Sequence, residues 1–335
     1  MGAYEKRLSD GSVQCTVCPN FCVMAPGERG RCLVRQNIDG HVVCITYGRA
    51  SGLGIDPIEK KPLNHFLPGT NVLSFGTAGC NLSCKFCQNW HLSHAQEVEA
   101  YSRDAMPEII AEAAVREGCR SVAFTYNEPT IFFEYALDTA KACHARGIKT
   151  VSVTCGYINP EPCRELYQHI DAANIDLKSF SDDFYQRLTG ARLQPVLDTI
   201  EYLVNETDVW VELTTLLIPG ENDSDEEIDA MTQWVVKKLG PYVPMHFTAF
   251  RPAGDMLEKP PTPLKTLERA WEIARKNGVH YAYVGNVRGS EKEHTYCHQC
   301  GKMLIERSGF YSALTGLNPD GTCSGCGTRC AGVFE

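Results

Sequence analysis

Short apolar runs rich in β-branched residues alternate with amphipathic segments from about residue 71 to residue 285. This alternation is typical of repeated βα units, in which a helix connects each parallel strand to the next. Six such units are fewer than the eight of a complete barrel, so we expect an α/β fold with a partial, open (βα)6 barrel and an active site at the C-terminal ends of its strands. The expected strands are six clear runs and a weaker seventh, at 71–76, 121–125, 149–154, 172–177, 209–216, 245–250 and 281–285.

Apolar residues at helical spacing predict helices between these strands. The two clearest stripes are Met106, Ile109, Ile110 and Ala113, and Leu197, Ile200, Leu203 and Val204. Ser224 and Glu227 form a capping-box pattern, in which each side chain accepts a hydrogen bond from a backbone N–H at the start of a helix. We therefore expect a helix to begin directly after Ser224.

The charge balance limits the possible partners. The 335 residues include 32 Lys and Arg against 41 Asp and Glu, which gives a net charge of -9. An acidic chain is repelled by the phosphates of nucleic acid and by anionic lipid, so neither is an expected partner. Residues 1–12 are polar and no run of about 18 apolar residues occurs, so we expect no secretory signal and no membrane span. These features predict a folded cytoplasmic protein.

Seventeen cysteines are many for such a protein, and most of them lie in clusters. Thiols stay reduced in the cytoplasm, so clustered cysteines point to metal binding or catalysis rather than to disulfides. Cys155 stands alone at a strand end, where a functional role is worth testing. The cysteines that fall within strand or helix patterns are expected to be small buried hydrophobic residues: Cys44, Cys119, Cys143 and Cys163.

One cysteine cluster directly follows the first expected strand. Cys80, Cys84 and Cys87 have the spacing Cys-x3-Cys-x2-Cys. Three thiolates on one loop can hold three irons of a cubane cluster, which leaves the fourth iron open to a small chelating molecule. A zinc site or a helical stripe is the alternative, but Gly79 and Asn81 favour a loop.

This spacing, with the aromatic Phe86 before the third cysteine, resembles the signature of the radical SAM superfamily over roughly residues 70–290. The resemblance implies an oxidoreductase whose 4Fe-4S cluster binds S-adenosylmethionine. It implies reductive cleavage to methionine and a 5'-deoxyadenosyl radical, which abstracts hydrogen from a substrate. A protein electron donor such as flavodoxin or ferredoxin is then an expected partner.

Polar motifs at later strand ends are similar to those of pyruvate formate-lyase activating enzymes, which make glycyl radicals in proteins. The resemblance implies contacts to cofactor or substrate, and Glu128 is a suitable acceptor for the methionine ammonium group. His246 lies within the sixth strand and is either a ligand or a satisfied core histidine. The candidate cofactor-binding residues are Phe86, Tyr126, Asn127, Glu128, Thr154, Asp176, Lys178 and Arg251.

A closer resemblance is to the AmmeMemoRadiSam-type radical SAM proteins. It rests on residues 56–69 (DPIEKKPLNHFLPG), on the sequence Gln88-Asn89-Trp90 after the cysteine loop, and on residues 126–129. It implies partners with AMMECR-type or MEMO-type domains. Lys60, Lys61 and His65 offer positive groups to an anionic substrate; a solvated turn with a packed Leu-Phe pair is the alternative.

Cysteine clusters at both ends divide the chain into an N-terminal module over 1–66, the barrel over 67–289 and a C-terminal module over 290–335. The C-terminal set has the paired Cys-x2-Cys spacing of a zinc ribbon and consists of Cys297, Cys300, Cys323 and Cys326. Cys330 and His294 could compete with these residues as ligands. Cysteine serves both zinc and iron–sulfur clusters, so either can occupy the N-terminal set of Cys15, Cys18, Cys22 and Cys32.

The leading hypothesis is a radical SAM enzyme with metal-binding ends, and the resemblance to activating enzymes suggests a protein glycine as its substrate. A small molecule or an RNA base is the competing substrate. A non-catalytic metal-binding interaction module is the alternative from a different class of protein. No catalytic residue is assigned from the sequence.

Overall fold

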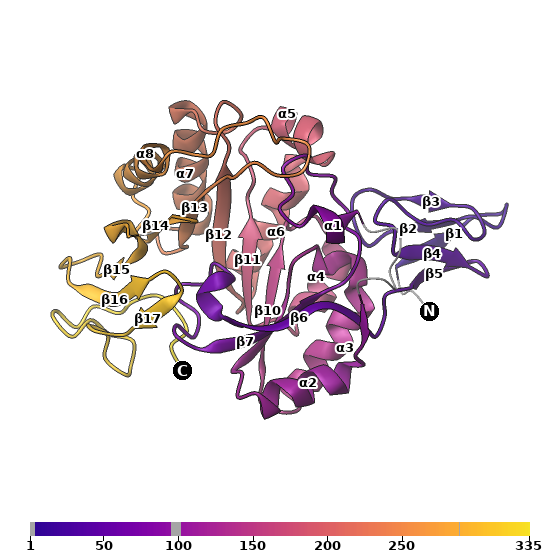
Figure 1. Ribbon diagram of the computed structural model, residues 1–335, viewed down its shortest axis with the longest axis horizontal. Helices are drawn as coiled ribbons and strands as arrows, with labels where there is room; N and C mark the ends of the chain where they lie inside the picture. Colours follow the sequence, from indigo (N-terminus) through magenta and orange to yellow (C-terminus); the bar gives the residue numbers. More distant parts are fainter. Residues whose placement is uncertain (1–3, 95–101, 288) are drawn as a thin grey trace.

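The computed structural model describes residues 4–94, 102–287 and 289–335, and its centre is a mixed sheet (Figure 1). Within the described residues this sheet has nine strands, in the order β14-β13-β12-β11-β10-β9-β7-β6-β8. All neighbours from β7 to β14 pair in parallel. The parallel strands are β7 (Asn71–Gly76), β9 (Ser121–Phe124), β10 (Lys149–Thr154), β11 (Ala172–Asp176), β12 (Trp210–Leu217), β13 (Met245–Ala249) and β14 (Ala282–Gly285).

A helix crosses from each parallel strand to the next, as the alternation in the sequence predicted. Shorter helices lie in the loops, at α1 (Trp90–Ser93) and α5 (Asp182–Phe184). The result is a mixed α/β fold whose large, mostly parallel sheet is consistent with a partial barrel. The connecting helices are α2 (Pro107–Arg116), α3 (Phe133–His144), α4 (Pro160–Tyr167), α6 (Leu193–Glu206), α7 (Asp225–Leu239) and α8 (Leu264–Lys276).

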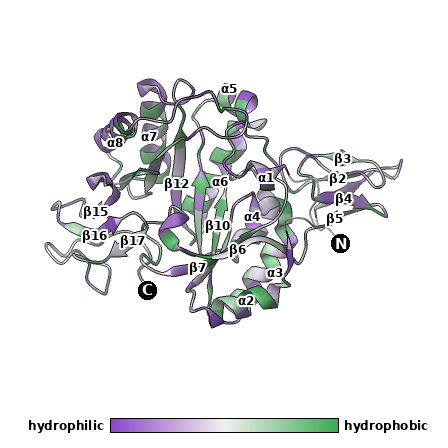
Figure 2. Ribbon diagram, in the orientation of Figure 1, coloured by the Kyte–Doolittle hydropathy of each residue, from purple (hydrophilic) through white to green (hydrophobic). Residues whose placement is uncertain are grey.

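The parallel strands are buried on both faces. All residues of β9 and β13 are buried, the polar His246 and Thr248 included, so these strands have no solvent-facing side. Figure 2 shows hydrophobic residues gathered in the central strands around β10, whereas β4 at the N-terminal end is mostly hydrophilic. The core of the molecule therefore lies along the central sheet.

The sheet begins earlier in the chain than the expected boundary at residue 66. Strand β6 (Arg49–Pro57) pairs antiparallel with β7, and the short β8 (Arg103–Asp104) pairs antiparallel with β6. Among the described strands, no ladder joins β8 to β14, so the sheet remains open. The N-terminal part of the chain thus supplies one edge of the central sheet.

Two details of the expected helices were wrong. Of the stripe expected around α2, Ile110 and Ala113 are buried as predicted, but Met106 before the helix and Ile109 within it are 50% and 54% exposed, because Ala111 and Ala114 complete the buried face. At the start of α7, Ser224 accepts a hydrogen bond from the Glu227 N–H, as expected. The Glu227 carboxylate, however, accepts hydrogen bonds from Ser179 Oγ and Phe180 N instead of the Ser224 N–H. It therefore fixes the loop after β11 rather than completing the capping box.

Small antiparallel sheets lie at opposite ends of the long axis of the molecule (Figure 1). The N-terminal end holds a three-stranded sheet and a hairpin, and the C-terminal end a second three-stranded sheet. The N-terminal strands are β1 (Glu5–Arg7), β2 (Val13–Cys15), β3 (Val23–Met24), β4 (Arg35–Ile38) and β5 (His41–Cys44). The C-terminal strands are β15 (Thr295–Tyr296), β16 (Met303–Ser308) and β17 (Tyr311–Ala313).

Buried polar contacts hold the C-terminal end against the central sheet. His65 is fully buried; its Nδ1 lies 2.6 Å from the Ala331 carbonyl oxygen and its Nε2 lies 2.5 Å from the Tyr283 hydroxyl. Glu212 on β12 accepts hydrogen bonds from the His65 N–H and from His246 Nε2, both at 2.7 Å. These contacts satisfy side chains that would otherwise be costly to bury.

Within residues 4–94, 102–287 and 289–335, no helix has both the length and the apolar character needed to cross a membrane.

The first prediction concerns acid stability. Burial lowers the pKa of His65 to about 4, below the value of about 6.5 expected for the unfolded chain. His65 therefore stabilises the fold fully above about pH 6.5, and this stabilisation is lost as the pH falls toward 4. A shift of this size corresponds to about 3 kcal/mol.

Guanidinium unfolding across this pH range tests the prediction. Between pH 6.5 and pH 4 the free energy of unfolding should decrease by up to about 3 kcal/mol more for the wild type than for His65→Gln. The exposed His91, changed to Gln, is the matched control and should follow the wild type. Equal decreases in the wild type and His65→Gln would contradict the proposed titration.

Candidate functional site

A cavity of about 1130 Å³ opens where the parallel strands end. Its wall includes residues one or two positions beyond β9, β10 and β13 and the last residue of β11, together with Lys61 from the segment before β7 and Arg307 from the C-terminal sheet. The candidate residues that reach this wall are Tyr126, Asn127, Thr154, Asp176, His246 and Arg251. The structure thus brings together residues that are far apart in the sequence.

Cys80, Cys84 and Cys87 lie on the loop that follows β7, as predicted, and not on a helix. Burial, with a smaller contribution from repulsion by the thiols of Cys84 and Cys87, raises the pKa of Cys80 well above its usual value. Burial raises the pKa of Cys84 to about 12. A thiol in this setting ionises readily only when a cation replaces its proton, which is what binding to iron would do.

Asn81 and Asn127 hold the cysteine loop in place. Asn81 Nδ2 donates a hydrogen bond to the Tyr157 carbonyl oxygen at 2.9 Å. Asn127 Nδ2 donates to the Gly79 carbonyl oxygen at 2.9 Å, and its Oδ1 accepts from the Thr77 N–H at 3.2 Å. The loop is therefore fixed to the ends of the neighbouring strands.

Lys178 and Asp176 form an ion pair of 2.8 Å at the end of β11, beside the cysteine loop. The Lys178 Nζ also lies 6.0 Å from the centre of the Phe86 ring, which packs against Phe184. Burial acts to lower the pKa of Lys178, but Asp176 and the thiols of Cys84 and Cys155 together raise it well above its usual value. Lys178 therefore supplies a lasting positive charge next to the cysteines.

Glu128 is buried and does not form part of the cavity wall. Its Oε1 accepts hydrogen bonds from Thr130 Oγ1 at 2.6 Å and Thr154 Oγ1 at 2.7 Å, and its Oε2 accepts from the Cys155 N–H at 2.7 Å. The carboxylate thus ties the end of β9 to the end of β10. Direct contact of Glu128 with an ammonium group remains a prediction.

Tyr126 has a left-handed backbone conformation, with φ of 70°, which is unusual for a bulky residue. The Tyr126 carbonyl oxygen accepts a hydrogen bond of 2.7 Å from Asn89 Nδ2, and the Tyr126 hydroxyl donates to Asp56 Oδ2 at 3.0 Å. The Lys61 Nζ lies 4.8 Å from the centre of its ring. These contacts compensate for the strained backbone and aim the ring at the cavity.

The segment before β7 is neither a solvated turn nor a set of free cations. Lys61 is buried and pairs with Asp56 at 2.8 Å, while Lys60 is more exposed and pairs with the same carboxylate at 2.7 Å. Both lysines line the cavity, but the fully buried His65 does not. The sequence did not reveal that Asp56 pairs with both lysines. Its position in the same motif as Lys60 and Lys61 could have indicated this pairing.

His246 is a satisfied buried histidine that also lines the cavity. It donates to Glu212 and stacks on Tyr283 with ring centres 5.1 Å apart. Glu212 was also missed, although a lone acidic residue inside an apolar strand run is a usable signal of a buried partner. Burial acts to raise the pKa of Glu212, but hydrogen bonds from His246 and its neighbours lower it to about 2.

Arg251, in contrast, is exposed at the cavity rim.

Cys155 is buried in the cavity wall, and burial and the nearby Glu128 raise its pKa well above the usual value. It interacts electrostatically with Cys80, so it belongs to the same site as the loop cysteines.

The four cysteines expected to be small buried hydrophobic residues are all buried, which confirms this prediction: Cys44, Cys119, Cys143 and Cys163.

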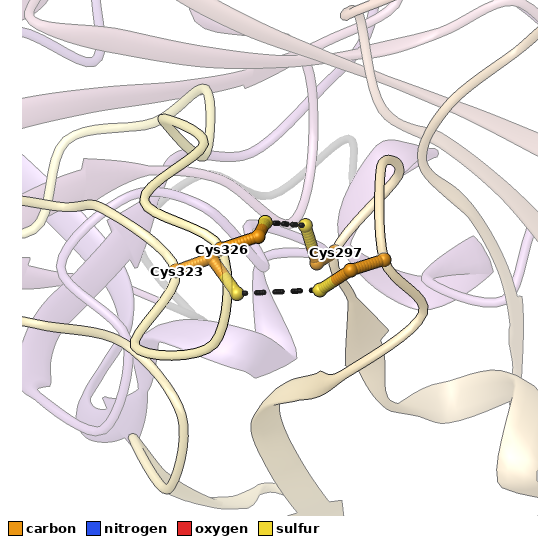
Figure 3. A group of neighbouring side chains, drawn as sticks. Cys297, Cys323 and Cys326 are labelled. Atoms are coloured by element: carbon orange, nitrogen blue, oxygen red, sulfur yellow. Dashed lines mark hydrogen bonds between the residues drawn. The ribbon is translucent and has the colours of Figure 1, made fainter.

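The C-terminal cysteines form a compact group (Figure 3). The ligand atoms of Cys297, Cys300, Cys323 and Cys326 all lie within 4.8 Å of one another. Neither of the competing ligands belongs to this group: His294 Nδ1 accepts from the Arg307 N–H, and Cys330 Sγ lies 3.8 Å from His65 Nδ1. Four thiols meeting around one point form a four-cysteine metal site, whose geometry suits a single tetrahedral ion.

The second prediction concerns Glu128. Replacing it by alanine leaves the buried Cys155 N–H and the hydroxyls of Thr130 and Thr154 without their acceptor. We expect the free energy of unfolding of Glu128→Ala to fall by roughly 3 kcal/mol. The exposed Glu258, changed to alanine, is the control, and chemical denaturation is the measurement. A loss as small as that of the control would show that these contacts do not stabilise the strand ends.

The third prediction concerns metal removal. Cys300→Ser should lower the zinc content measured by mass spectrometry by about one ion per chain. Because binding and folding of small metal sites are coupled, β15–β17 should also become sensitive to protease. The buried Cys119, changed to serine, is the control. An unchanged metal content would refute the site, and a different metal in the wild type would refute zinc.

Comparison with known proteins places this geometry in a family. The sequence model of the radical SAM superfamily matches residues 75–231. An uncharacterized protein of Methanocaldococcus jannaschii is 42% identical over 327 residues, which cover 97% of each chain. The pyruvate formate-lyase 1-activating enzyme of Escherichia coli K12 is 28% identical over 166 residues, which cover 48% of this chain and 65% of that enzyme.

A solved structure supports the fold. The radical SAM methyltransferase from Sphaerobacter thermophilus superposes with a TM-score of 0.53 at 18% identity, covering 67% of this chain and 68% of that one. The residues matched by the sequence model contain the cysteine loop and the ends of β9, β10 and β11. The chain therefore belongs to the radical SAM superfamily and is distantly related to pyruvate formate-lyase activating enzymes.

Proposed function

We propose that this protein reductively cleaves S-adenosylmethionine and uses the resulting radical to abstract hydrogen from a protein glycine. The observation that carries the cleavage reaction is the cysteine loop held at the strand ends, beside a large cavity with polar walls. When bound, a 4Fe-4S cluster and S-adenosylmethionine together supply a 5'-deoxyadenosyl radical. The donor set fits this cluster, because three neighbouring thiols leave one iron without a protein ligand.

The surrounding residues provide charge and position. Cys80, Cys84 and Cys87 would hold three irons, and the positive charge of Lys178 would offset the negative charge of the thiolates. Asn127, Thr154 and Asp176 present amide, hydroxyl and carboxylate groups in the cavity wall, which suit the amino acid and ribose groups of S-adenosylmethionine. Arg251 presents a guanidinium at the rim.

The relationship to activating enzymes supports glycine as the substrate class, because one of those enzymes is 28% identical to this chain over 166 residues. An AmmeMemoRadiSam-type assignment is the finer proposal, with a MEMO-type or AMMECR-type protein as the partner that carries the target. Residues 56–69, on which it rests, place Lys60 and Lys61 in the cavity wall and are thus part of the site. A low-potential flavodoxin or ferredoxin would supply the electron.

The fourth prediction tests the cleavage reaction. Anaerobically reconstituted protein with S-adenosylmethionine and dithionite should form 5'-deoxyadenosine, measured by chromatography. Cys84→Ala should abolish the product, because the cluster loses one of its three protein ligands. Cys163→Ala removes a buried thiol distant in sequence from the loop and should retain activity. Product formed by Cys84→Ala would refute the assignment.

Isotope transfer tests the substrate. Wild-type protein is incubated with an extract of cells grown on deuterated glycine, after separation into protein and small-molecule fractions. Deuterium in 5'-deoxyadenosine from the protein fraction alone supports a protein glycine. Deuterium only from the small-molecule fraction would overturn that substrate while leaving the cleavage reaction intact.

A further inference from the structure

The four N-terminal cysteines surround a small internal space. Cys15, at the end of β2, lines a cavity of about 20 Å³ together with the other three, and the loop between β2 and β4 brings them there. The buried Arg35 closes this space on one side and pairs with Glu134 at 2.6 Å. The members of this N-terminal cysteine site are Cys15, Cys18, Cys22 and Cys32.

The separation of the thiols differs from that of the C-terminal group. A single zinc ion needs four sulfurs at about 2.3 Å from one point, which places them within about 4 Å of one another. Among the described residues, only the C-terminal group brings three or more ligand atoms within 4.8 Å, and the N-terminal site does not. The loop cysteines, which belong to a radical SAM protein, do not either.

The N-terminal thiols nevertheless line one common cavity, and their mutual repulsion adds to the effect of burial in raising the pKa of Cys18. Cys18 interacts with Cys15, Cys22 and Cys32. Thiols that line one common cavity, yet stand farther apart than the ligands of a single ion, suit a group of several atoms better than one ion. Clusters of iron and inorganic sulfide separate their cysteine ligands in this way.

Backbone N–H groups point at the sulfurs of the N-terminal site. The Arg31 N–H donates to Cys22 Sγ at 3.4 Å. Such donors stabilise the negative charge on sulfur and are among the features that tune iron–sulfur clusters. Hydrogen bonds from the backbone at Val17, Asn20 and Val34 likewise act to lower the pKa of Cys15, Cys18 and Cys32, against the larger effect of burial.

The N-terminal site lies directly against the cysteine loop of the barrel. Gly79 has a left-handed backbone, with φ of 84°, and a Cβ on it would collide with the Cys32 carbonyl oxygen. Asn20 Nδ2 donates to the Asn81 carbonyl oxygen at 2.7 Å, and Arg31 donates to Ser83 Oγ at 2.8 Å. Cys32 is thus in backbone contact with the residue that precedes Cys80.

We propose that Cys15, Cys18, Cys22 and Cys32 hold an iron–sulfur cluster that passes single electrons to the cluster on the Cys80–Cys87 loop. A low-potential one-electron donor protein reduces the N-terminal cluster by one electron. That cluster is oxidised again when it gives the electron to the loop cluster, which is reduced by one; no bond forms or breaks and no proton moves. The electron transfer rests on the proposed function, whereas the N-terminal cluster itself does not.

The first experiment isolates the N-terminal cluster. The triple variant Cys80→Ala, Cys84→Ala, Cys87→Ala is reconstituted anaerobically with iron and sulfide. We expect it to retain about two to four irons with equal sulfide, and a paramagnetic signal after reduction. Adding Cys18→Ser and Cys22→Ser should remove both iron and signal, whereas adding Cys143→Ser and Cys163→Ser should not. Zinc without sulfide in the triple variant, or no metal, would overturn the proposal.

The second experiment tests electron transfer in otherwise wild-type protein. The variant Cys18→Ser, Cys22→Ser should still assemble the loop cluster, seen by its paramagnetic signal after reduction with dithionite. Its reduction by flavodoxin should be slower by an order of magnitude or more, while reduction by the small molecule dithionite stays unchanged. Equal rates with flavodoxin would overturn the relay. Neither measurement depends on cleavage of S-adenosylmethionine, so failure of the proposed function would be seen separately.

Discussion

Parallel pairing of the central strands determines where chemistry can take place in this protein. Because β7 and β9–β14 all run in the same direction, their C-terminal ends meet at one side of the sheet. The residues just beyond those ends come from segments up to about 170 residues apart, yet they line one cavity. Glu128 reinforces this arrangement, because its carboxylate, which follows β9, accepts two short hydrogen bonds from the end of β10.

The two cysteine-rich ends contribute to the site in different ways. The C-terminal sheet forms part of the cavity wall through Arg307, which donates to the Asn64 carbonyl oxygen at 2.7 Å. The four-cysteine group therefore stabilises a segment that borders the site. The N-terminal end instead packs against the cysteine loop, where Gly79 allows the close approach of Cys32. The C-terminal end thus forms part of the cavity wall, and the N-terminal end contacts the cysteine loop that would hold the iron–sulfur cluster.

Much of the fold was predictable from particular residues. Strands such as Met245–Ala249 are buried on both faces, so apolar residues predominate in them, with His246 and Thr248 as polar exceptions. Helix faces were less certain: Ile109 fits a helical stripe but points to solvent, since α2 packs through its small residues Ala111 and Ala114. The Glu227 carboxylate was misassigned because a residue from another loop, Phe180, competes for it. Such competition between distant segments leaves no local pattern.

By itself, the sequence determined which cysteines can act together, because spacing along a loop fixes which thiols reach a common centre. It also placed Lys178 and Asp176 at a strand end, where a parallel sheet gathers its polar residues. Only the tertiary structure decided how far apart the thiols stand. The C-terminal four converge within 4.8 Å and suit one ion, whereas the N-terminal four surround an open space. The physical reason is that ligand separation depends on the path of the backbone between cysteines, and packing against the rest of the protein sets that path.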